Sequence, residues 1–230
     1  MSEPSRKLVI VGDSAIAEVA FEYFTHDSPY EVAAFAVNDA FRTRDALFDR
    51  PVVAFESLET THPPADHDVF VALSYQKLNR VRARLFGEAK AKGYRLASYV
   101  SARAFVWRNV TIGENCFIFE NNVLQPFVRI GDDVTLWSGN HIGHHSRVRD
   151  HAFIASHVVI SGFCDIGEYT FMGVNATVAN NVTIARDNLI GANAVILRDT
   201  EPGKLYGIKG TPAHERMTPY QYYGMEPESA

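Results

Sequence analysis

The chain has 230 residues, an apolar fraction of 47% and a formal net charge of −5. This length predicts one large domain or two small ones with a sizeable core. The charge gives no reason to expect nucleic acid or an anionic membrane as a partner. No apolar run approaches the ~18 residues of a transmembrane helix, and residues 1–7 lack the apolar stretch of a signal peptide.

The N-terminal third alternates short apolar runs with stretches of helical periodicity. Strands are predicted for residues 7–11, 31–37 and 68–73, and helices for residues 15–24 and 76–92. This alternation predicts a small parallel α/β domain, and such sheets bind ligands at the carboxyl ends of their strands. The candidate binding residues therefore follow the three strands directly: Gly12, Asp13, Ser14, Asn38, Asp39 and Ser74.

The turn after the first strand carries one glycine, Gly12, instead of the three in G-x-G-x-x-G. Gly12 lets the backbone approach a ligand closely, and the N-terminus of the following helix favours an anion such as phosphate. The same residues equally fit a plain turn in which Ser14 caps the helix. Without the fingerprint, a full dinucleotide cofactor is not expected.

Seventeen six-residue units follow without a gap from Val100 to Glu201. The first residue of each unit is aliphatic and the fifth is small or medium-sized. Helices repeat near every 3.6 residues and simple strands every two, so a strict period of six predicts stacked short strands that bury their apolar side chains against neighbouring repeats. Three units make one triangular coil, and a coil spacing of ~4.8 Å predicts a prism ~27 Å long.

Both cysteines of the chain, Cys116 and Cys164, occupy the fifth position of a unit, eight units apart. That separation places them on different faces of a three-sided coil. We therefore expect two buried small residues without a disulfide, which is typical of a reducing cytoplasm.

Histidines are concentrated in the repeats, and three of them, His145, His151 and His157, are six residues apart. They are predicted at equivalent positions on three different faces, so they cannot converge within one chain. This weakens a zinc site, which needs convergent imidazoles and an open water position. For His151 and His157, the sequence favours a polar ladder on a solvated or intersubunit surface.

His144 differs from the other histidines because Gly162 stacks beside it, 18 residues further on. A glycine there is expected to expose its backbone N–H next to the imidazole. Acyl transfer needs two such groups, a base for the attacking amine or hydroxyl and a donor for the oxyanion. The alternative is a purely structural pair.

Four segments resemble a known family, the left-handed parallel β-helix acyltransferases. The likeness is to the sugar acetyltransferases that make acetylated bacillosamine and perosamine, and to sialic acid O-acetyltransferases. It spans nearly the whole chain and rests on these segments: Val9-Ile-Val-Gly12, Phe70-Val-Ala-Leu-Ser74 with Asn79-Arg80, Ile142-Gly-His144-His145 and Gly210-Thr-Pro-Ala213. It implies a Rossmann-like α/β domain over residues 1–98, a left-handed parallel β-helix over 99–203 and a tail over 204–230.

The resemblance implies a homotrimer that uses acetyl-CoA, with no metal, to acetylate the amino group of a nucleotide-linked deoxyamino sugar. It assigns His144 as general base and the Gly162 amide as oxyanion donor. The sugar nucleotide is expected on the rim of the α/β domain described above. Acetyl-CoA is expected in the groove between two β-helices, at Gly162, Ser156, Val174, Ala192, Gly210 and Pro212.

Two positions depart from the family pattern. An acidic residue usually follows the catalytic histidine, where it orients the ring and raises its basicity, but this chain has His145. Either a carboxylate elsewhere, Asp150 or Asp165, orients His144, or His145 is itself the base. Asp13 is the second departure, because its charge is unfavourable beside a phosphate unless it contacts the sugar or the nucleobase.

Three other functions are compatible with parts of the pattern. O-acetylation of a sugar hydroxyl, such as one of a sialic acid, needs the same machinery. An ice-binding β-helix would show regular Thr rows, which the scattered Gly, His, Arg and Asn do not provide, and a metal-dependent lyase or hydratase is the third alternative. The tyrosine-rich tail, residues 217–230, fits either docking on a neighbouring β-helix or a loosely ordered terminus.

Overall fold

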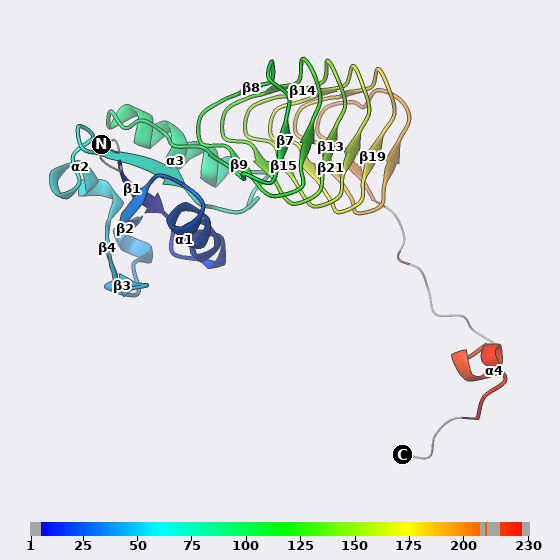
Figure 1. The fold of residues 1–230 in the computed structure, drawn as a ribbon, viewed down its shortest axis with the longest axis horizontal. Helices are drawn as coiled ribbons and strands as arrows, with labels where there is room; N and C mark the ends of the chain where they lie inside the picture. The colour runs from blue at the N-terminus through cyan, green and yellow to red at the C-terminus, as the bar shows by residue number, and fades with distance from the viewer. Residues whose placement is uncertain (1–5, 208–209, 211–216, 227–230) are drawn as a thin grey trace.

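A computed structural model describes residues 6–207, 210 and 217–226 of the chain. The α/β domain packs along one side of a left-handed parallel β-helix (Figure 1), and its contacts reach from Phe117 in an early coil to Phe171 and Asp187 in later ones. Both parts of the predicted fold are confirmed, in the predicted order. A short helix that the sequence did not predict, α4 (Pro219–Tyr223), lies apart from both.

The α/β domain is built on a five-stranded sheet with the order β3-β4-β2-β1-β5. The pairs β4-β2, β2-β1 and β1-β5 are parallel, and β3 pairs antiparallel with β4. The strands are β1 (Lys7–Val11), β2 (Glu31–Val37), β3 (Ala46–Leu47), β4 (Arg50–Ala54) and β5 (His67–Val71). The first two predicted strands have the observed bounds, whereas β3 and β4 were not predicted.

Helices cover both faces of this sheet. Helix α1 (Ala15–His26) buries Ala17, Phe21 and Phe24 on one face, and α3 (Arg80–Ala91) buries Leu85 and Phe86 on the other together with α2 (Leu58–Thr61). Two 3-10 turns, η1 (Asp39–Phe41) and η2 (Phe55–Ser57), complete the domain. Among the described helices, none has the length and apolar character needed to cross a bilayer.

Helix α3 begins four residues later than the periodicity predicted. The three residues before it, Lys77, Leu78 and Asn79, have φ angles of 51°, 49° and 63°. A helix cannot continue through this left-handed region of backbone space. The helical composition of residues 76–79 therefore forms a turn, and this turn helps to shape a pocket described below.

The β-helix consists of two-residue strands on three sheets, and each strand pairs in parallel with the strand 18 residues away. At the C-terminal end the spacing falls to 16, where Leu205 pairs with Leu189. Sheet C has seven strands: β6 (Tyr99–Val100), β9 (Phe117–Ile118), β12 (Thr135–Leu136), β15 (Phe153–Ile154), β18 (Phe171–Met172), β21 (Leu189–Ile190) and β23 (Leu205–Tyr206). Sheet D has six: β7 (Phe105–Val106), β10 (Val123–Leu124), β13 (His141–Ile142), β16 (Val159–Ile160), β19 (Thr177–Val178) and β22 (Val195–Ile196). Sheet E has five: β8 (Thr111–Ile112), β11 (Arg129–Ile130), β14 (Arg147–Val148), β17 (Asp165–Ile166) and β20 (Thr183–Ile184).

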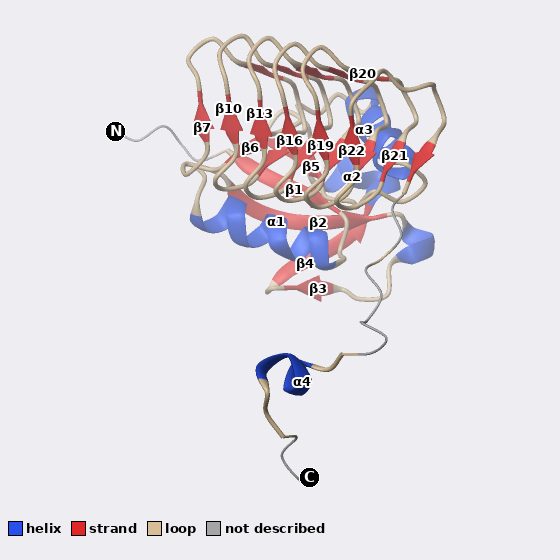
Figure 2. Ribbon diagram, turned by 90° about the vertical axis from the view of Figure 1, so that its right-hand side faces the viewer, coloured by secondary structure: helices blue, strands red, loops and turns tan. Residues whose placement is uncertain are grey.

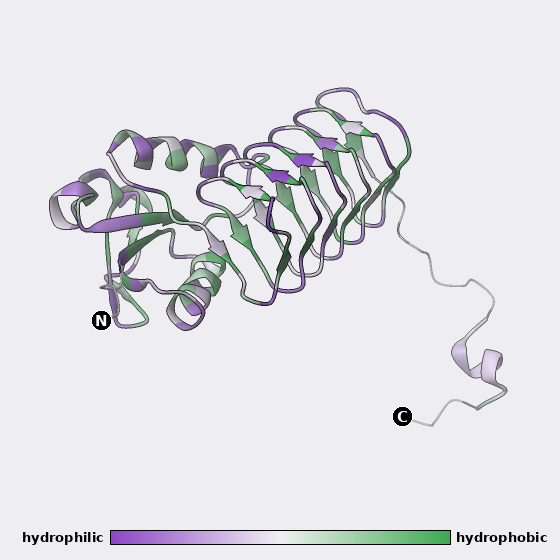
Figure 3. Cartoon of the chain, turned by 45° about the horizontal axis from the view of Figure 1, so that its top comes forward, coloured by the Kyte–Doolittle hydropathy of each residue, from purple (hydrophilic) through white to green (hydrophobic). Residues whose placement is uncertain are grey.

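The hexapeptide pattern explains this geometry. The second residue of each strand points inward, and Leu124, Ile142 and Ile160 stack in register and are fully buried. Hydrophobic residues recur along the strands of the prism and hydrophilic residues occupy many of its turns (Figure 3). Most turns contain one residue with positive φ, at the same place in each unit, as at His145, His151 and His157.

The two cysteines confirm the predicted direction of the fifth repeat position. Cys116 and Cys164 are both free and buried, and both belong to the core of the prism. Cys116 precedes a strand of sheet C, whereas Cys164 precedes a strand of sheet E, so they lie on different faces. Burial raises the pKa of Cys116 to about 12 and also raises that of Cys164, so neither thiol is available as a nucleophile.

The three faces of the prism differ in what they present outward. Sheet C presents aromatic residues such as Phe117, which packs with α1 of the α/β domain. Sheet E presents mainly polar and charged residues, among them Arg129 and Arg147. Sheet D is open in Figure 2, where its strands form a row in front of the α/β domain, and the exposed apolar side chains on this face include Phe105, Val159 and Val195.

Candidate active site

His144, in the turn between β13 and β14, lies beside Gly162, in the turn between β16 and β17, as predicted. The His144 side chain is exposed at the edge between sheets D and E. A Cβ atom built on Gly162 would lie 2.8 Å from His144 Cε1 and 3.0 Å from Nε2. The imidazole therefore occupies the space that any side chain at position 162 would need, which gives the glycine a specific role.

The Gly162 amide is not the open donor that was expected. Its N–H donates to Asn180 Oδ1 at 2.9 Å, and the His144 N–H likewise donates to Gln125 Oε1 at 2.9 Å. The side-chain oxygens of Asn180 and Gln125, each from a neighbouring coil, thus accept the hydrogen bonds of these two backbone amides. Asn180 is exposed, so its side chain has room to leave the Gly162 amide without disturbing the core.

The His144 ring contacts the neighbouring imidazole of His145. The two Nδ1 atoms are 3.2 Å apart, and the His145 ring stacks between Phe127 and Phe163, with ring centroids at 4.5 and 4.8 Å. The edge of the prism therefore carries a column of three aromatic rings, one in each of three successive coils, beside the exposed imidazole of His144.

Neither carboxylate that was considered for orienting His144 has that role. Asp150 accepts the backbone N–H of Asp132 at 2.9 Å, and Asp165 forms a two-pronged ion pair with Arg149 at 2.6 and 2.8 Å. Both lie at or near the edge between sheets E and C, one edge away from His144. The expectation of a distant orienting carboxylate is therefore wrong for the two residues named.

The three histidines spaced by six residues do not converge, as predicted, but they lie at the three edges of the prism and not on its faces. His145 lies between sheets D and E, His151 between E and C, and His157 between C and D. Within the described residues, no group of three or more histidine, cysteine, aspartate or glutamate side chains could hold a metal ion. His157 is exposed. His151 was expected in a polar ladder on a solvated or intersubunit surface, but it is mostly covered by the α/β domain of the same chain.

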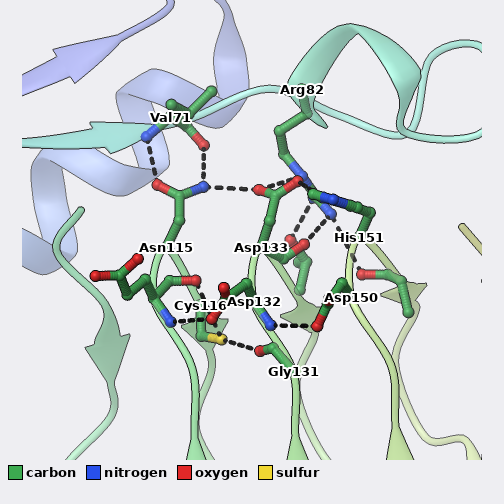
Figure 4. Close-up of polar contacts among 12 residues, drawn as sticks. Val71, Arg82, Asn115, Cys116, Gly131, Asp132, Asp133, Asp150 and His151 are labelled. Carbon is green, nitrogen blue, oxygen red and sulfur yellow. Dashed lines mark hydrogen bonds and ion pairs between the residues drawn. The ribbon is translucent and has the colours of Figure 1, made fainter. Parts of the chain in front are cut away.

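His151 belongs to a polar network between the two domains (Figure 4). Its Nδ1 lies 2.9 Å from Asp133 Oδ2, and Asp133 is fully buried. Arg82 of α3 is also buried, and its Nε lies 3.0 Å from Asp133 Oδ1 as an ion pair. Asn115 Nδ2 donates to the same carboxylate at 2.7 Å, and its Oδ1 accepts the N–H of Val71 at 2.7 Å. This network covers the edge of strand β5 and fixes the α/β domain against the β-helix.

A pocket of about 480 Å³ opens at the carboxyl ends of β1 and β2. Four of the predicted rim residues line it: Gly12, Asp13, Ser14 and Asn38. Two cationic side chains that were not predicted, Lys77 and Arg84, line it as well. They belong to the turn before α3 and to α3 itself, where the sequence pattern indicated only a helix and not the direction of each side chain.

The turn after β1 has a structural requirement of its own. Gly12 has φ +123°, and a Cβ there would lie 2.7 Å from the carbonyl oxygen of Ala72. Ser14 occupies the N-cap position of α1, yet its side chain makes no capping hydrogen bond. Asp13 lies 3.6 Å from Arg44 in an ion pair, which partly offsets the negative charge that was expected to disfavour phosphate.

Asp39 and Ser74 lie apart from the other rim residues. The Asp39 N–H donates to Glu56 at 3.0 Å, and its carboxylate pairs with Arg42 at 3.2 Å. A hydrogen bond from Asn38 holds the pKa of Glu56 below its usual value, which keeps this carboxylate charged. Ser74 lines a second cavity, between the α/β domain and sheet C.

This second cavity has a volume of about 520 Å³ and contains the column predicted to contact the pantetheine arm. Ser156, Val174 and Ala192 line it from the edge between sheets C and D. Tyr75, which was not predicted, faces them and packs on Phe153 and Phe171 with ring centroids at 5.1 and 4.5 Å. No atom of the described residues lies within 4 Å of a Cβ built on Gly210, and Pro212 lies outside those residues.

Comparison with known proteins identifies the repeats. They match the family model described as bacterial transferase hexapeptide (six repeats), over residues 109–144 and 127–162. A search of curated proteins gives no match.

Solved structures match much more of the chain. The acetyltransferase domain of PglB from Neisseria gonorrhoeae FA1090 is 25% identical, with a TM-score of 0.79, and the match covers 88% of this chain and 96% of that one. PerB from Caulobacter crescentus, solved with CoA and GDP-perosamine, is 26% identical, with a TM-score of 0.75 and coverage of 86% and 92%. A His-to-Asn mutant of perosamine N-acetyltransferase from the same organism, with the same two ligands, is 26% identical, with a TM-score of 0.78 and coverage of 89% and 97%. These matches confirm the predicted resemblance.

Proposed function

We propose that this chain, an acyltransferase built on hexapeptide repeats, uses acetyl-CoA to acetylate the amino group of a nucleotide-linked deoxyamino sugar. The observation that carries the proposal is the exposed imidazole of His144, held over the bare Cα of Gly162. The similar structures support the substrate classes, because two of them contain CoA and GDP-perosamine.

The proposed reaction is a direct transfer with His144 as general base. The acceptor nitrogen attacks the thioester carbonyl while His144 takes its proton, and the CoA thiolate leaves and receives that proton. The Gly162 amide stabilises the oxyanion after Asn180 releases it. A covalent acyl-cysteine plays no part, since both thiols are buried in the prism.

The pocket at the strand ends of the α/β domain is the proposed site of the nucleotide. Lys77 and Arg84 supply positive charge for the phosphates. The Ser14 hydroxyl, which makes no capping hydrogen bond to α1, adds a hydrogen-bonding group where the helix dipole favours an anion. Asp13, paired with Arg44, is then left to contact the sugar or the base.

A homotrimer is proposed because the parts of the site lie on opposite edges of one face. His144 lies at the edge between sheets D and E, whereas Ser156, Val174 and Ala192 lie at the edge between C and D. In a cyclic assembly with heterologous contacts, one edge of each copy meets the opposite edge of the next. The exposed apolar residues of sheet D support this face as the contact, and acetyl-CoA would bind between two copies.

The function is tested by incubating the full chain with acetyl-CoA and a panel of amino-sugar and hydroxy-sugar nucleotides. We expect release of the free CoA thiol and an N-acetylated product with at least one amino sugar, and sedimentation as a trimer. The absence of both CoA release and CoA binding by calorimetry would overturn the proposal.

O-acetylation of a sugar hydroxyl is the second candidate. The exposed His144 imidazole, which takes the proton of the acceptor in the proposed step, serves a hydroxyl as well as an unprotonated amine. A product acetylated on oxygen, obtained from the hydroxy-sugar arm of the same panel, would favour this candidate.

A further inference from the structure

The contact between His144 and His145 has only one arrangement that leaves His144 able to act as a base. Two imidazole nitrogens 3.2 Å apart form a hydrogen bond when one carries a hydrogen and the other a lone pair. If His145 were the donor, a neutral His144 would carry its hydrogen on Nε2 and could not accept a proton there. If His144 donates from Nδ1, its Nε2 has the free lone pair.

The neighbours of His145 fix the plane of its ring. Phe127 and Phe163 stack on its two faces at interplanar angles of 27° and 17°. The His144 ring stands nearly perpendicular to it, at 87°, and is nearly perpendicular to Phe163 as well, at 86°. The stack therefore holds the nitrogen edge of His145 toward His144, as a packed side chain holds a catalytic group in place.

Among the contacts of these two rings in the described chain, the other partners carry no charge. Gln125 accepts the backbone N–H of His144, Gly162 lies beneath its ring, and Phe127 and Phe163 enclose His145. Each imidazole is thus the titratable neighbour of the other.

We infer that His145 is a positioning residue that accepts a hydrogen bond on Nδ1 from His144, in place of the usual carboxylate. It selects the tautomer of His144 whose Nε2 is free to take the proton of the acceptor. When His144 becomes an imidazolium, the same bond remains with a neutral His145. The inference rests on the proposed function for its kinetic consequences, but the tautomer itself is a property of the ligand-free protein.

The kinetic test compares three substitutions at position 145 in the full chain. His145→Phe keeps the aromatic stack and removes the acceptor, so kcat should fall roughly 10- to 100-fold, the range for losing a group that orients a functional histidine, with KM for acetyl-CoA unchanged. His145→Gln retains an acceptor oxygen and should recover most of that loss. His145→Glu should move the acidic limb of the pH–rate profile upward by about one pH unit, because a negative charge stabilises the imidazolium.

A second readout does not depend on turnover. In the ligand-free protein labelled with ¹⁵N-histidine, the neutral His144 ring should carry its hydrogen on Nδ1, with signals assigned by their loss in His144→Asn. In His145→Phe that preference should disappear. Wild-type kcat in His145→Phe, or a hydrogen on Nε2 of neutral His144 in the wild-type chain, would overturn the inference. If no substrate on the panel is acetylated, the proposed function fails while the tautomer measurement still decides the role of His145.

Discussion

His145 and His151 occupy the same position in successive repeats and have the same backbone φ of 61°. Their surroundings differ completely. His151 is 16% exposed and bonded to a buried carboxylate, whereas His145 is exposed and bonded to another imidazole. The hexapeptide repeat therefore gives equivalent positions the same backbone conformation. The element packed on each edge decides the exposure and the hydrogen-bond partner of the side chain at that position.

The physical cause is the placement of helix α3. It covers the edge between sheets E and C with Arg82 and Phe86, which removes water from Asp133 and His151. A charge in such a site must be paired. At the edge with His144, the described residues leave the imidazole in contact with solvent. A base that must meet a substrate needs that exposure, and a structural ion pair does not.

The largest expected effect is at the exposed edge. His144→Asn should lower kcat by roughly 10²- to 10⁴-fold, the range for removing a general base. The melting temperature should change little, because the side chain is exposed. Steady-state assays and thermal denaturation check this, with His26→Asn, at an exposed histidine of α1, as the control. Unchanged turnover in His144→Asn would remove this residue from the mechanism.

At the buried edge the expected effect is on stability. Arg82→Met leaves the Asp133 carboxylate with one charged partner fewer and should lower the free energy of unfolding by about 3–5 kcal/mol. Arg80→Met, on the same helix, breaks an exposed pair with Asp187 and should cost about 1 kcal/mol or less. Chemical denaturation of the two variants measures the contrast. Equal losses would mean that burial does not distinguish the two arginines.

Gly162→Ala tests the contact beneath His144. The new methyl group would lie 2.8 Å from His144 Cε1 and displace the ring. A misplaced catalytic group should lower kcat about 10²-fold. Gly87→Ala is the control, because a built Cβ there meets nothing within 4 Å. That change, inside α3, should leave kcat alone and stabilise the fold by roughly 0.5–1 kcal/mol. A fully active Gly162→Ala enzyme would contradict the assigned geometry.

The smallest expected effect compares the two histidines directly. His151→Phe removes a hydrogen bond to a buried carboxylate and should cost roughly 1.5–3 kcal/mol of unfolding free energy. It should leave kcat within a few-fold of the wild-type value. His145→Phe, in contrast, should lower kcat and leave the free energy of unfolding nearly unchanged. Denaturation and kinetics on both variants measure this. A loss of turnover in His151→Phe at full stability would show that the two edges are not separated in function.

Much of the site was predictable because the constant repeat length fixes which residues of neighbouring coils lie side by side. A period of 18 residues places Gly162 beside His144 and separates His145, His151 and His157, and the structure agrees on both points. The rim of the α/β domain was predicted less well. Lys77 and Arg84 line its pocket. A turn with positive φ at residues 77–79 decides the direction of their side chains, and the hydrophobic periodicity does not predict that turn.

The sequence by itself determined the prism, the inward direction of both cysteines and the neighbours along each edge. Those features follow from short-range register, since each repeat packs on the one 18 residues away. Only the tertiary structure decided which edge the α/β domain covers, which carboxylates are buried and that Asn180 occupies the Gly162 amide. These three features depend on how side chains far apart in the chain pack and exclude water. The repeat pattern describes only neighbouring coils, so it does not predict that packing.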